Sequence, residues 1–287
     1  MQERQGRIDL HMHSTVSDGT DTPMKLLDNV RAAGISVFSV TDHDAIHSAQ
    51  ILRGLLKRND PLFIPGVEFS CKDALGKYHI LGYGFDPDAA PLHVLVARGH
   101  SLRMQKVVAR LKLLQETYGF VFPEEEVALL LNQYNPGKPH IGNMMIRLGY
   151  AASMDDAIDN YIDHVHVHAD HILPQEAIQA ILVGGGIPVL AHPLFGSGGE
   201  QIYGADMEKR LRRLMEYGLQ GVEVFYSGFS AAQRSEMLSF AEKFNLYVTA
   251  GSDYHGKNKP VVLGDTGLPE TGAYPDGLKR FLEELGI

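Results

Sequence analysis

The chain has 287 residues, a length that suits one large domain or two small ones. Hydrophobic residue types make up 44% of the chain and charged types 21%, which allows a sizeable core and excludes disordered, collagen-like and coiled-coil proteins. The net charge of −9 makes long nucleic acid a poor partner, although a small phosphorylated molecule could still bind through metal ions. Cys71 is the only cysteine, so no intrachain disulfide can form. With neither a signal peptide nor an apolar run of membrane-spanning length, we expect a cytoplasmic protein that does not contact membranes.

Short apolar runs bounded by Gly, Pro or Asp predict buried parallel strands. The seven runs are 7–13, 36–41, 62–69, 78–85, 188–191, 221–225 and 246–250. Helical patterns lie between most of them. The segment 23–33 has Thr22 as its N-cap and proline at its first position, and the segment 230–244 opens with a capping-box pair, Ser230 and Gln233. This alternation predicts an α/β fold built on a parallel sheet or barrel.

The alternation stops in the middle of the chain. Between about 92 and 171 the pattern favours helices, at 101–116, 124–132, 140–148 and 154–162, and no strand. We therefore expect a helical insertion subdomain at 92–171 between the two parts of the barrel, 1–91 and 172–287. Near the end of the insertion, His164, His166 and His168 would share one side of an extended segment. A solvent-facing edge is favoured there over an extra metal site or a pocket wall.

Side chains that bind metals follow the predicted strands. His11 and His13 end the first strand and, being two apart, face the same way. Similar residues at or near the other strands and in the loop after the first are Asp18, His43, Glu68, His79, His192, Asp253 and His255. The carboxyl ends of parallel strands meet at one edge of such folds, and imidazole and carboxylate groups bind Zn, Mn and Fe. One histidine at a strand end is usually structural, but burying the whole set without metal would be costly, so the set predicts a metal centre.

The same motifs resemble a known family. They are Asp9-Leu-His-Met-His13, Ser17-Asp-Gly19, Thr41-Asp-His-Asp44, Gly66-Val-Glu68, Ala191-His-Pro193 and Gly251-Ser-Asp-Tyr-His255, together with His79. Their order and approximate spacing resemble the PHP (polymerase and histidinol phosphatase) family, most of all its stand-alone bacterial phosphoesterases that hydrolyse nucleotide monophosphates or 3′,5′-bisphosphates. The resemblance implies a distorted (β/α)7 TIM-like barrel with a helical insertion, holding two or three Mn, Fe or Zn ions.

The resemblance also implies a ligand set, position by position. The first ion would be held by His11, His13, Glu68 and Asp253, the second by Glu68, His79 and His140, and the third by Asp18, His43, His192 and His255. His140 enters through the segment Gly137-Lys-Pro-His140, which matches a ligand segment of the family's insertion.

The resemblance implies fewer substrate contacts than metal ligands. Arg103, in the basic stretch 98–110, matches an arginine that binds the substrate phosphate, and Arg147 is a second candidate. A solvated helix face explains Lys106 and Arg110 better. Phe229 stands where relatives often carry histidine and could stack on a base or another flat group. The segment from His164 onward replaces a lysine-containing loop of relatives.

The expected activity is hydrolysis of a phosphate monoester of a nucleotide or similar small phosphorylated metabolite, by attack of a metal-bound hydroxide. Asp253 belongs to the expected catalytic set with His192 and His255, either of which could protonate the leaving alcohol. The alternatives are a 3′–5′ exonuclease or oligonucleotide phosphoesterase, an amidohydrolase-type C–N hydrolase and a metal-binding regulatory module. The amidohydrolase class usually places a bridging lysine where this chain has Glu68. The sequence leaves the ester, the metals and the oligomeric state open.

Overall fold

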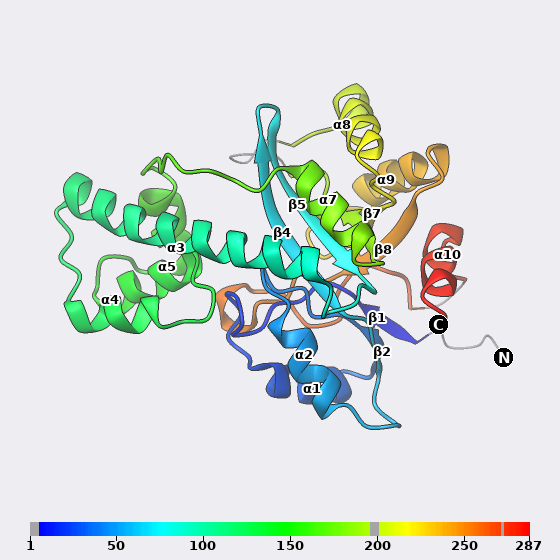
Figure 1. Cartoon of the computed structure of the whole chain (residues 1–287), viewed down its shortest axis with the longest axis horizontal. Helices are drawn as coiled ribbons and strands as arrows, with labels where there is room; N and C mark the ends of the chain where they lie inside the picture. Colours follow the sequence, from blue (N-terminus) through cyan, green and yellow to red (C-terminus); the bar gives the residue numbers. More distant parts are fainter. Residues whose placement is uncertain (1–5, 196–200, 271–272) are drawn as a thin grey trace.

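The computed structural model describes residues 6–195, 201–270 and 273–287. Its strands form two sheets (Figure 1). The first holds three parallel strands, β1 (Arg7–Asp9), β2 (Ile35–Phe38) and β3 (Leu62–Phe63). The second is ordered β4 (Gly66–Asp73), β5 (Gly76–Tyr83), β6 (Ile187–Leu190), β7 (Gly221–Tyr226) and β8 (Tyr247–Gly251). The α/β class is therefore confirmed.

Two details differ from the predicted set of parallel strands. The run 62–69 divides into β3 and β4, because Pro65 lies between them and cannot donate a hydrogen bond to a sheet. β5 runs antiparallel to β4, since Asp73 pairs with Gly76 and a turn this short can only reverse the chain. β5 is also antiparallel to β6. The sheet topology does not show a closed TIM-like barrel. The two sheets are linked by isolated bridges, Met12 to Tyr254 and His43 to Glu68.

Helices cover the sheets and fill the middle of the chain. They are α1 (Pro23–Ala32), α2 (His47–Leu55), α3 (Ala90–Tyr118), α4 (Glu124–Leu131), α5 (Lys138–Arg147), α6 (Met154–Ala157), the π-helical turn η1 (Ile158–Ile162), α7 (Pro174–Val183), α8 (Gly204–Glu216), α9 (Ala231–Lys243), the 3-10 turn η2 (Gly256–Asn258) and α10 (Asp276–Glu284). Both predicted caps form, with Thr22 accepting from the backbone N–H of Lys25 and Ser230 from that of Gln233. Within the described ranges, no helix is both long enough and apolar enough to cross a bilayer.

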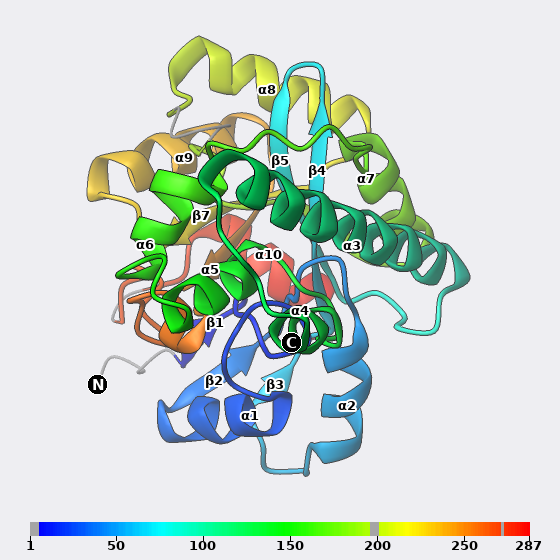
Figure 2. The same ribbon diagram turned by 90° about the vertical axis from the view of Figure 1, so that its left-hand side faces the viewer.

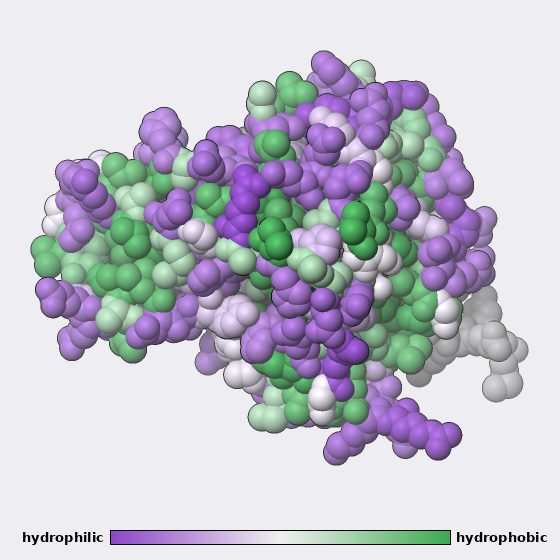
Figure 3. Space-filling model, in the orientation of Figure 1, coloured by the Kyte–Doolittle hydropathy of each residue, from purple (hydrophilic) through white to green (hydrophobic). Residues whose placement is uncertain are grey.

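The segment from α3 to η1 contains helices and loops and extends away from the sheets (Figures 1 and 2). α3 begins at Ala90, well before the predicted 101, and its first half packs into the main core through Leu92, Leu95 and Leu102. Its second half joins a separate core with α5, in which Leu114 and Met144 are fully buried. Figure 3 shows apolar side chains at the surface of this segment as well as polar ones. α3 thus packs against both the sheets and the rest of the helical segment.

Candidate metal centre

Two backbone pairings bring the predicted ligands together. The backbone N–H of His13 donates to Tyr254 at 2.8 Å and that of Asp253 donates to His11 at 2.7 Å, so the segments 11–13 and 253–255 run side by side. The bridge between His43 and Glu68 does the same for the segment that follows β2 and the start of β4. Asp253 and His192 have φ angles of 58° and 25°, in the left-handed region that most residues avoid. Such strain persists where the surrounding structure holds it, often at functional sites.

Glu68 lies at the centre of the resulting cluster and is 1% exposed. One of its oxygens, Oε2, lies 3.4 Å from Nε2 of His11, 3.2 Å from Nε2 of His13 and 2.9 Å from Nδ1 of His43. The other, Oε1, lies 2.8 Å from Nδ1 of His79 and 3.2 Å from Nε2 of His192. A single carboxylate is therefore shared by five imidazoles.

Three overlapping groups in the cluster have ligand atoms within 4.8 Å of one another. They are His13, Asp18, His43 and His255; His11, His13 and Asp253; and His43, Glu68 and His79. Several of their atoms are buried and form no hydrogen bond, namely Nε2 of His11 and His13, Nδ1 of His43, Oδ1 of Asp18 and Oε2 of Glu68. Buried polar atoms are seldom left without a partner, and converging nitrogen and oxygen atoms are what a divalent transition-metal ion requires. The residues present fit such ions.

Electrostatics within the cluster favour charged carboxylates. Burial would raise the pKa of Glu68, but His43, His79 and His11 hold that pKa well below its usual value. Burial opposes the ionisation of Asp18 too, and His43 and His255 outweigh it, so its pKa is also lowered. Both side chains therefore carry the charge that binds a cation.

Residues outside the predicted ligand set hold it in place. The carboxylate of Glu223 contacts Nδ1 of His11 at 2.9 Å and accepts from the backbone N–H of His192 at 2.8 Å. Oδ2 of Asp253 accepts from Tyr226 at 3.0 Å and from Lys259 at 2.5 Å, while Oδ1 faces His11 and His13. Sequence reasoning missed all three supporting residues. A signal existed for Glu223 alone, an acidic residue within a strand of apolar neighbours.

We predict that Glu223→Gln weakens metal binding by roughly 10–100-fold, the usual effect of losing a group that orients a ligand histidine. If the amide oxygen faces the backbone N–H of His192, the amide NH₂ faces Nδ1 of His11. That arrangement forces the proton onto Nε2, the nitrogen turned toward the cluster. Calorimetric titration with Mn²⁺ measures the change, with Glu216→Gln on the exposed surface of α8 as the control. Equal affinity in Glu223→Gln and the unmodified protein would contradict this role.

Three predicted residues lie apart from the cluster or are otherwise occupied. His140, near the start of α5, accepts through Nδ1 from the backbone N–H of Gly137 at 3.1 Å and is in none of the three groups. Arg147 pairs with Glu126 at 2.6 Å, and its side chain is 54% exposed. Phe229 is 4% exposed and packs against Phe195 and Tyr226, so its ring has a packing role here.

Arg103 lies beside the cluster. Its Nε donates to Asp44 at 2.7 Å and its Nη2 to the hydroxyl of Ser70 at 3.1 Å. Burial would lower the pKa of Arg103, but Asp44 and Asp18 outweigh that effect and raise it. The guanidinium is therefore a permanent cation next to the candidate metal ligands.

The chain is similar to several known enzymes, although no family model matches it. It is 29% identical to the phosphoribosyl 1,2-cyclic phosphate 1,2-diphosphodiesterase of Eggerthella lenta, over 87% of this chain and 94% of that one. It is 26% identical to the 3′,5′-nucleoside bisphosphate phosphatase of Chromobacterium violaceum, over 86% and 87%, and 26% identical to a 5′-3′ exoribonuclease of Haemophilus influenzae, over 89% and 95%.

Solved structures share the fold. A candidate metal-dependent phosphoesterase from Bifidobacterium adolescentis superposes with a TM-score of 0.84 at 24% identity, over 99% of this chain and 98% of that one. An amidohydrolase from Chromobacterium violaceum superposes with a TM-score of 0.80 at 24% identity, over 97% of this chain and 96% of that one. The fold, the relatives and the cluster define the class: the chain is related to hydrolases that cleave phosphoesters with metal ions. Its homologues are phosphoesterases of the PHP type, so the resemblance seen in the motifs is confirmed.

Proposed function

We propose that this protein hydrolyses a phosphate monoester of a nucleotide or a similar small phosphorylated metabolite, using two or three divalent ions such as Mn, Fe or Zn. One observation carries the proposal: buried histidine and carboxylate atoms without hydrogen-bond partners converge around Glu68. The relative that hydrolyses nucleoside bisphosphates supports a small substrate, as does the net charge of −9.

The ligands divide among the ions as follows. His11, His13 and Asp253 would hold one ion together with Glu68, and Glu68 would also hold a second ion with His79. The third would take Asp18, His43 and His255, with His192 as a further ligand. When bound, such ions make a water molecule more acidic and offset charge on a phosphate. We keep His140 as an additional ligand of the second ion, which would require its ring to leave Gly137.

The protein's own groups act on the phosphate and the leaving group. Arg103 is placed to contact non-bridging phosphate oxygens, and Arg147 would be a second contact only after leaving Glu126. Nδ1 of His255 donates to the carbonyl oxygen of Asp253 at 2.9 Å, and its Nε2 lies 3.4 Å from Oδ1 of Asp18. We assign proton transfer to the leaving alcohol to His255 or His192, with Asp253 orienting the site.

Residues 92–171 would act as a cap over the two parts of the barrel, 1–91 and 172–287. Pro139, Met154 and Ile158, from α5, α6 and η1, border a groove whose other side is formed by cluster residues including His43 and His192. A cap of this kind shields the reacting phosphate from bulk water. A second function, cleavage of oligonucleotides, is favoured by the relatives named 5′-3′ exoribonucleases, whose polarity is opposite to the 3′–5′ alternative considered above.

The test is phosphate release by the Mn²⁺-reconstituted protein from a panel of esters. The panel holds a 5′-mononucleotide, a nucleoside 3′,5′-bisphosphate, a short 5′-phosphorylated oligoribonucleotide, histidinol phosphate and a sugar phosphate. We expect the largest kcat/KM for a mononucleotide or bisphosphate, and loss of that activity with chelator. Exclusive cleavage of the oligonucleotide would replace the monoester proposal with the nuclease one, and no release from any ester with metal bound would overturn both.

A further inference from the structure

The loop that follows β1 folds around a carboxylate outside the candidate ligand set. Asp42 is fully buried in the segment that follows β2. Its Oδ1 accepts from the backbone N–H of Ser14 at 2.8 Å and from that of Ser17 at 3.2 Å. Its Oδ2 accepts from the hydroxyl of Ser14 at 2.8 Å and from the hydroxyl of Ser48. Asp42 is in none of the three ligand groups found among the described residues, so its charge is used to hold protein groups.

The hydroxyl of Ser17 connects this carboxylate to a candidate ligand. Oγ of Ser17 lies 2.6 Å from Oδ1 of Asp42 and 3.3 Å from Nδ1 of His13, and all three side chains are fully buried. A carboxylate can only accept hydrogen bonds, so the hydroxyl donates its single proton to Asp42. The lone pairs of the same oxygen then face His13, and Nδ1 of that ring carries the proton that is donated to them.

A proton held at Nδ1 leaves the other nitrogen of the ring for an ion. Nε2 of His13 lies 3.2 Å from Oε2 of Glu68 and 3.3 Å from Oδ1 of Asp253, at the centre of the cluster. An ion that binds there displaces the proton of Nε2, while Nδ1 keeps its own. The chain from Asp42 through Ser17 to His13 therefore fixes both the orientation of this ring and its metal-binding form.

The two histidines at the end of the first strand are held in different ways. Nδ1 of His11 contacts Glu223 directly at 2.9 Å, whereas Nδ1 of His13 reaches a carboxylate only through one hydroxyl. A neutral hydroxyl passes less negative charge to the ring than a carboxylate in direct contact does. Losing the hydroxyl should therefore cost less metal affinity than losing the charge of Glu223.

The same carboxylate holds the turn that presents a second candidate ligand. Asp18 follows Ser17 directly in the chain. The backbone N–H groups of Ser17 and Gly19 both donate to the carbonyl oxygen of Ser14, at 3.1 and 3.0 Å. Since Asp42 also binds the backbone N–H groups of Ser14 and Ser17, it holds this turn closed. One buried carboxylate thus supports candidate ligands of two different ions.

We propose that Asp42 is a positioning residue of the metal centre, which acts through the hydroxyl of Ser17 to hold the ring of His13 with Nε2 toward an ion. The inference rests on the proposed function only in that the cluster binds divalent ions. It assigns roles to two residues that would contact neither an ion nor a substrate.

The first test compares two serines that bind opposite oxygens of Asp42. Ser17→Ala and Ser48→Ala each remove one hydroxyl from this carboxylate, so both should lower the melting temperature of the metal-free protein by a similar amount. Only Ser17→Ala also removes the contact with His13, and we expect it to weaken Mn²⁺ binding by roughly tenfold in calorimetric titration. Mn²⁺ affinities of Ser17→Ala and Ser48→Ala that are equal would overturn the proposal.

A double variant tests whether Asp42 acts through Ser17. Asp42→Asn should weaken Mn²⁺ binding at least as much as Ser17→Ala does. Adding Ser17→Ala to Asp42→Asn should change the affinity little further, because both substitutions break the same chain of contacts. Fully additive losses would show that the two residues act independently and would overturn the chain. Should Asp42→Asn fail to fold, the comparison of the two serines decides the proposal.

Nitrogen NMR of histidine-labelled protein with Zn²⁺ bound gives a signature that a purely structural role would not change. We expect Nδ1 of His13 to carry a proton that exchanges slowly with water, and faster in Ser17→Ala but not in Ser48→Ala. A ring without a proton on Nδ1 would overturn the proposal. Neither titration nor NMR needs a substrate, so a protein that binds these ions but hydrolyses no ester would overturn the proposed function alone.

Discussion

Replacing Glu68 with glutamine should lower kcat for phosphoester hydrolysis by roughly a thousandfold, the upper range for losing one essential electrostatic group. Glu68 is the carboxylate on which His11, His13, His43, His79 and His192 converge, at 2.8 to 3.4 Å. Glutamine has nearly the same size but no charge, and its NH₂ group cannot bind a cation. The variant should therefore bind fewer metal ions while keeping its fold.

Metal content by mass spectrometry and the far-UV circular dichroism spectrum test the two halves of this prediction together. Glu242→Gln, on the exposed surface of α9, changes the same charge away from the site and should retain full activity. A Glu68→Gln protein with normal metal content and turnover within about threefold of the unmodified enzyme would rule out a bridging role for Glu68.

Removing the metal with a chelator should abolish hydrolysis and lower the melting temperature, and Mn²⁺ should restore both. Ions that bind only the folded state stabilise it by about 2.7 kcal/mol at a hundred times the dissociation constant. Removing the ions would leave buried ligand atoms of His11, His13 and Glu68 without a partner, because these atoms form no hydrogen bond within the protein. Scanning calorimetry at several Mn²⁺ concentrations measures the shift. A melting temperature independent of Mn²⁺ would argue against metal binding by the folded protein.

The apparent affinity of the protein for Mn²⁺, measured by calorimetric titration, should depend on pH in a defined direction. Burial would lower the pKa of His13, but the carboxylates of Asp253 and Glu68 close to its Nε2 outweigh that effect and raise the pKa to about 9 in the metal-free cluster. An ion that binds His13 must then displace a proton at any pH below about 9. Apparent Mn²⁺ affinity should therefore rise as the pH rises from 6 toward 9. Affinity that is flat over this range would mean that His13 is already neutral or is not a ligand.

Much of the fold could be read from local patterns. The caps at Thr22 and Ser230 form as predicted because a side-chain oxygen and a backbone N–H three residues on are neighbours whatever surrounds them. The apolar runs at 188–191 and 246–250 become β6 and β8 within about one residue. Their surroundings are apolar on both faces, so continuous hydrophobic sequence is enough to identify them.

The metal-binding residue types of the candidate site could also be predicted from the sequence. The residues that hold these ligands in place could not. Imidazole and carboxylate groups at strand ends are rare enough as packing residues to indicate metal chemistry. Glu223, Tyr226 and Lys259 act only through contacts with ligands far away in the sequence. No spacing rule links Lys259 to Tyr226, and only the folded chain brings them to the same oxygen of Asp253.

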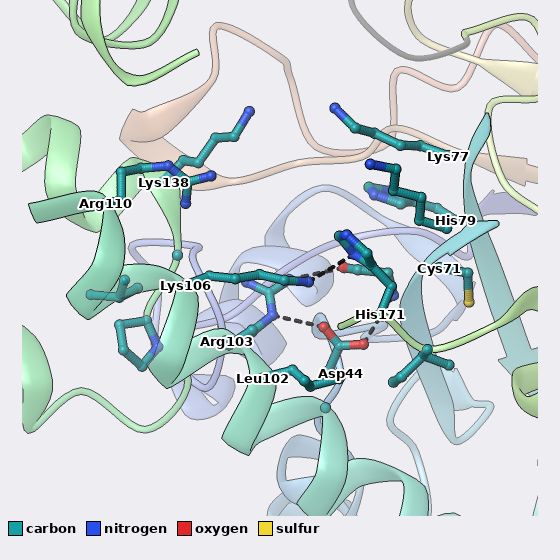
Figure 4. A pocket seen from close by; sticks show the side chains of 17 residues that line it. Asp44, Cys71, Lys77, His79, Leu102, Arg103, Lys106, Arg110, Lys138 and His171 are labelled. Carbon is teal, nitrogen blue, oxygen red and sulfur yellow. Dashed lines mark hydrogen bonds and ion pairs between the residues drawn. The ribbon is translucent and has the colours of Figure 1, made fainter. Parts of the chain in front are cut away.

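The sequence by itself determined the α/β class, the helical middle segment and the ligand-type residues that the structure gathers around Glu68. Tertiary structure alone decided the antiparallel direction of β5, the burial of Phe229 and the cavity that contains Lys106 and Arg110. The physical reason is the same in each case. Periodicity defines which side chains share a face of an element, but the partner that covers that face comes from distant segments. By its own sequence α3 looks solvated at Lys106 and Arg110, but in the folded chain the hairpin of β4 and β5 lies across the same cavity from them (Figure 4).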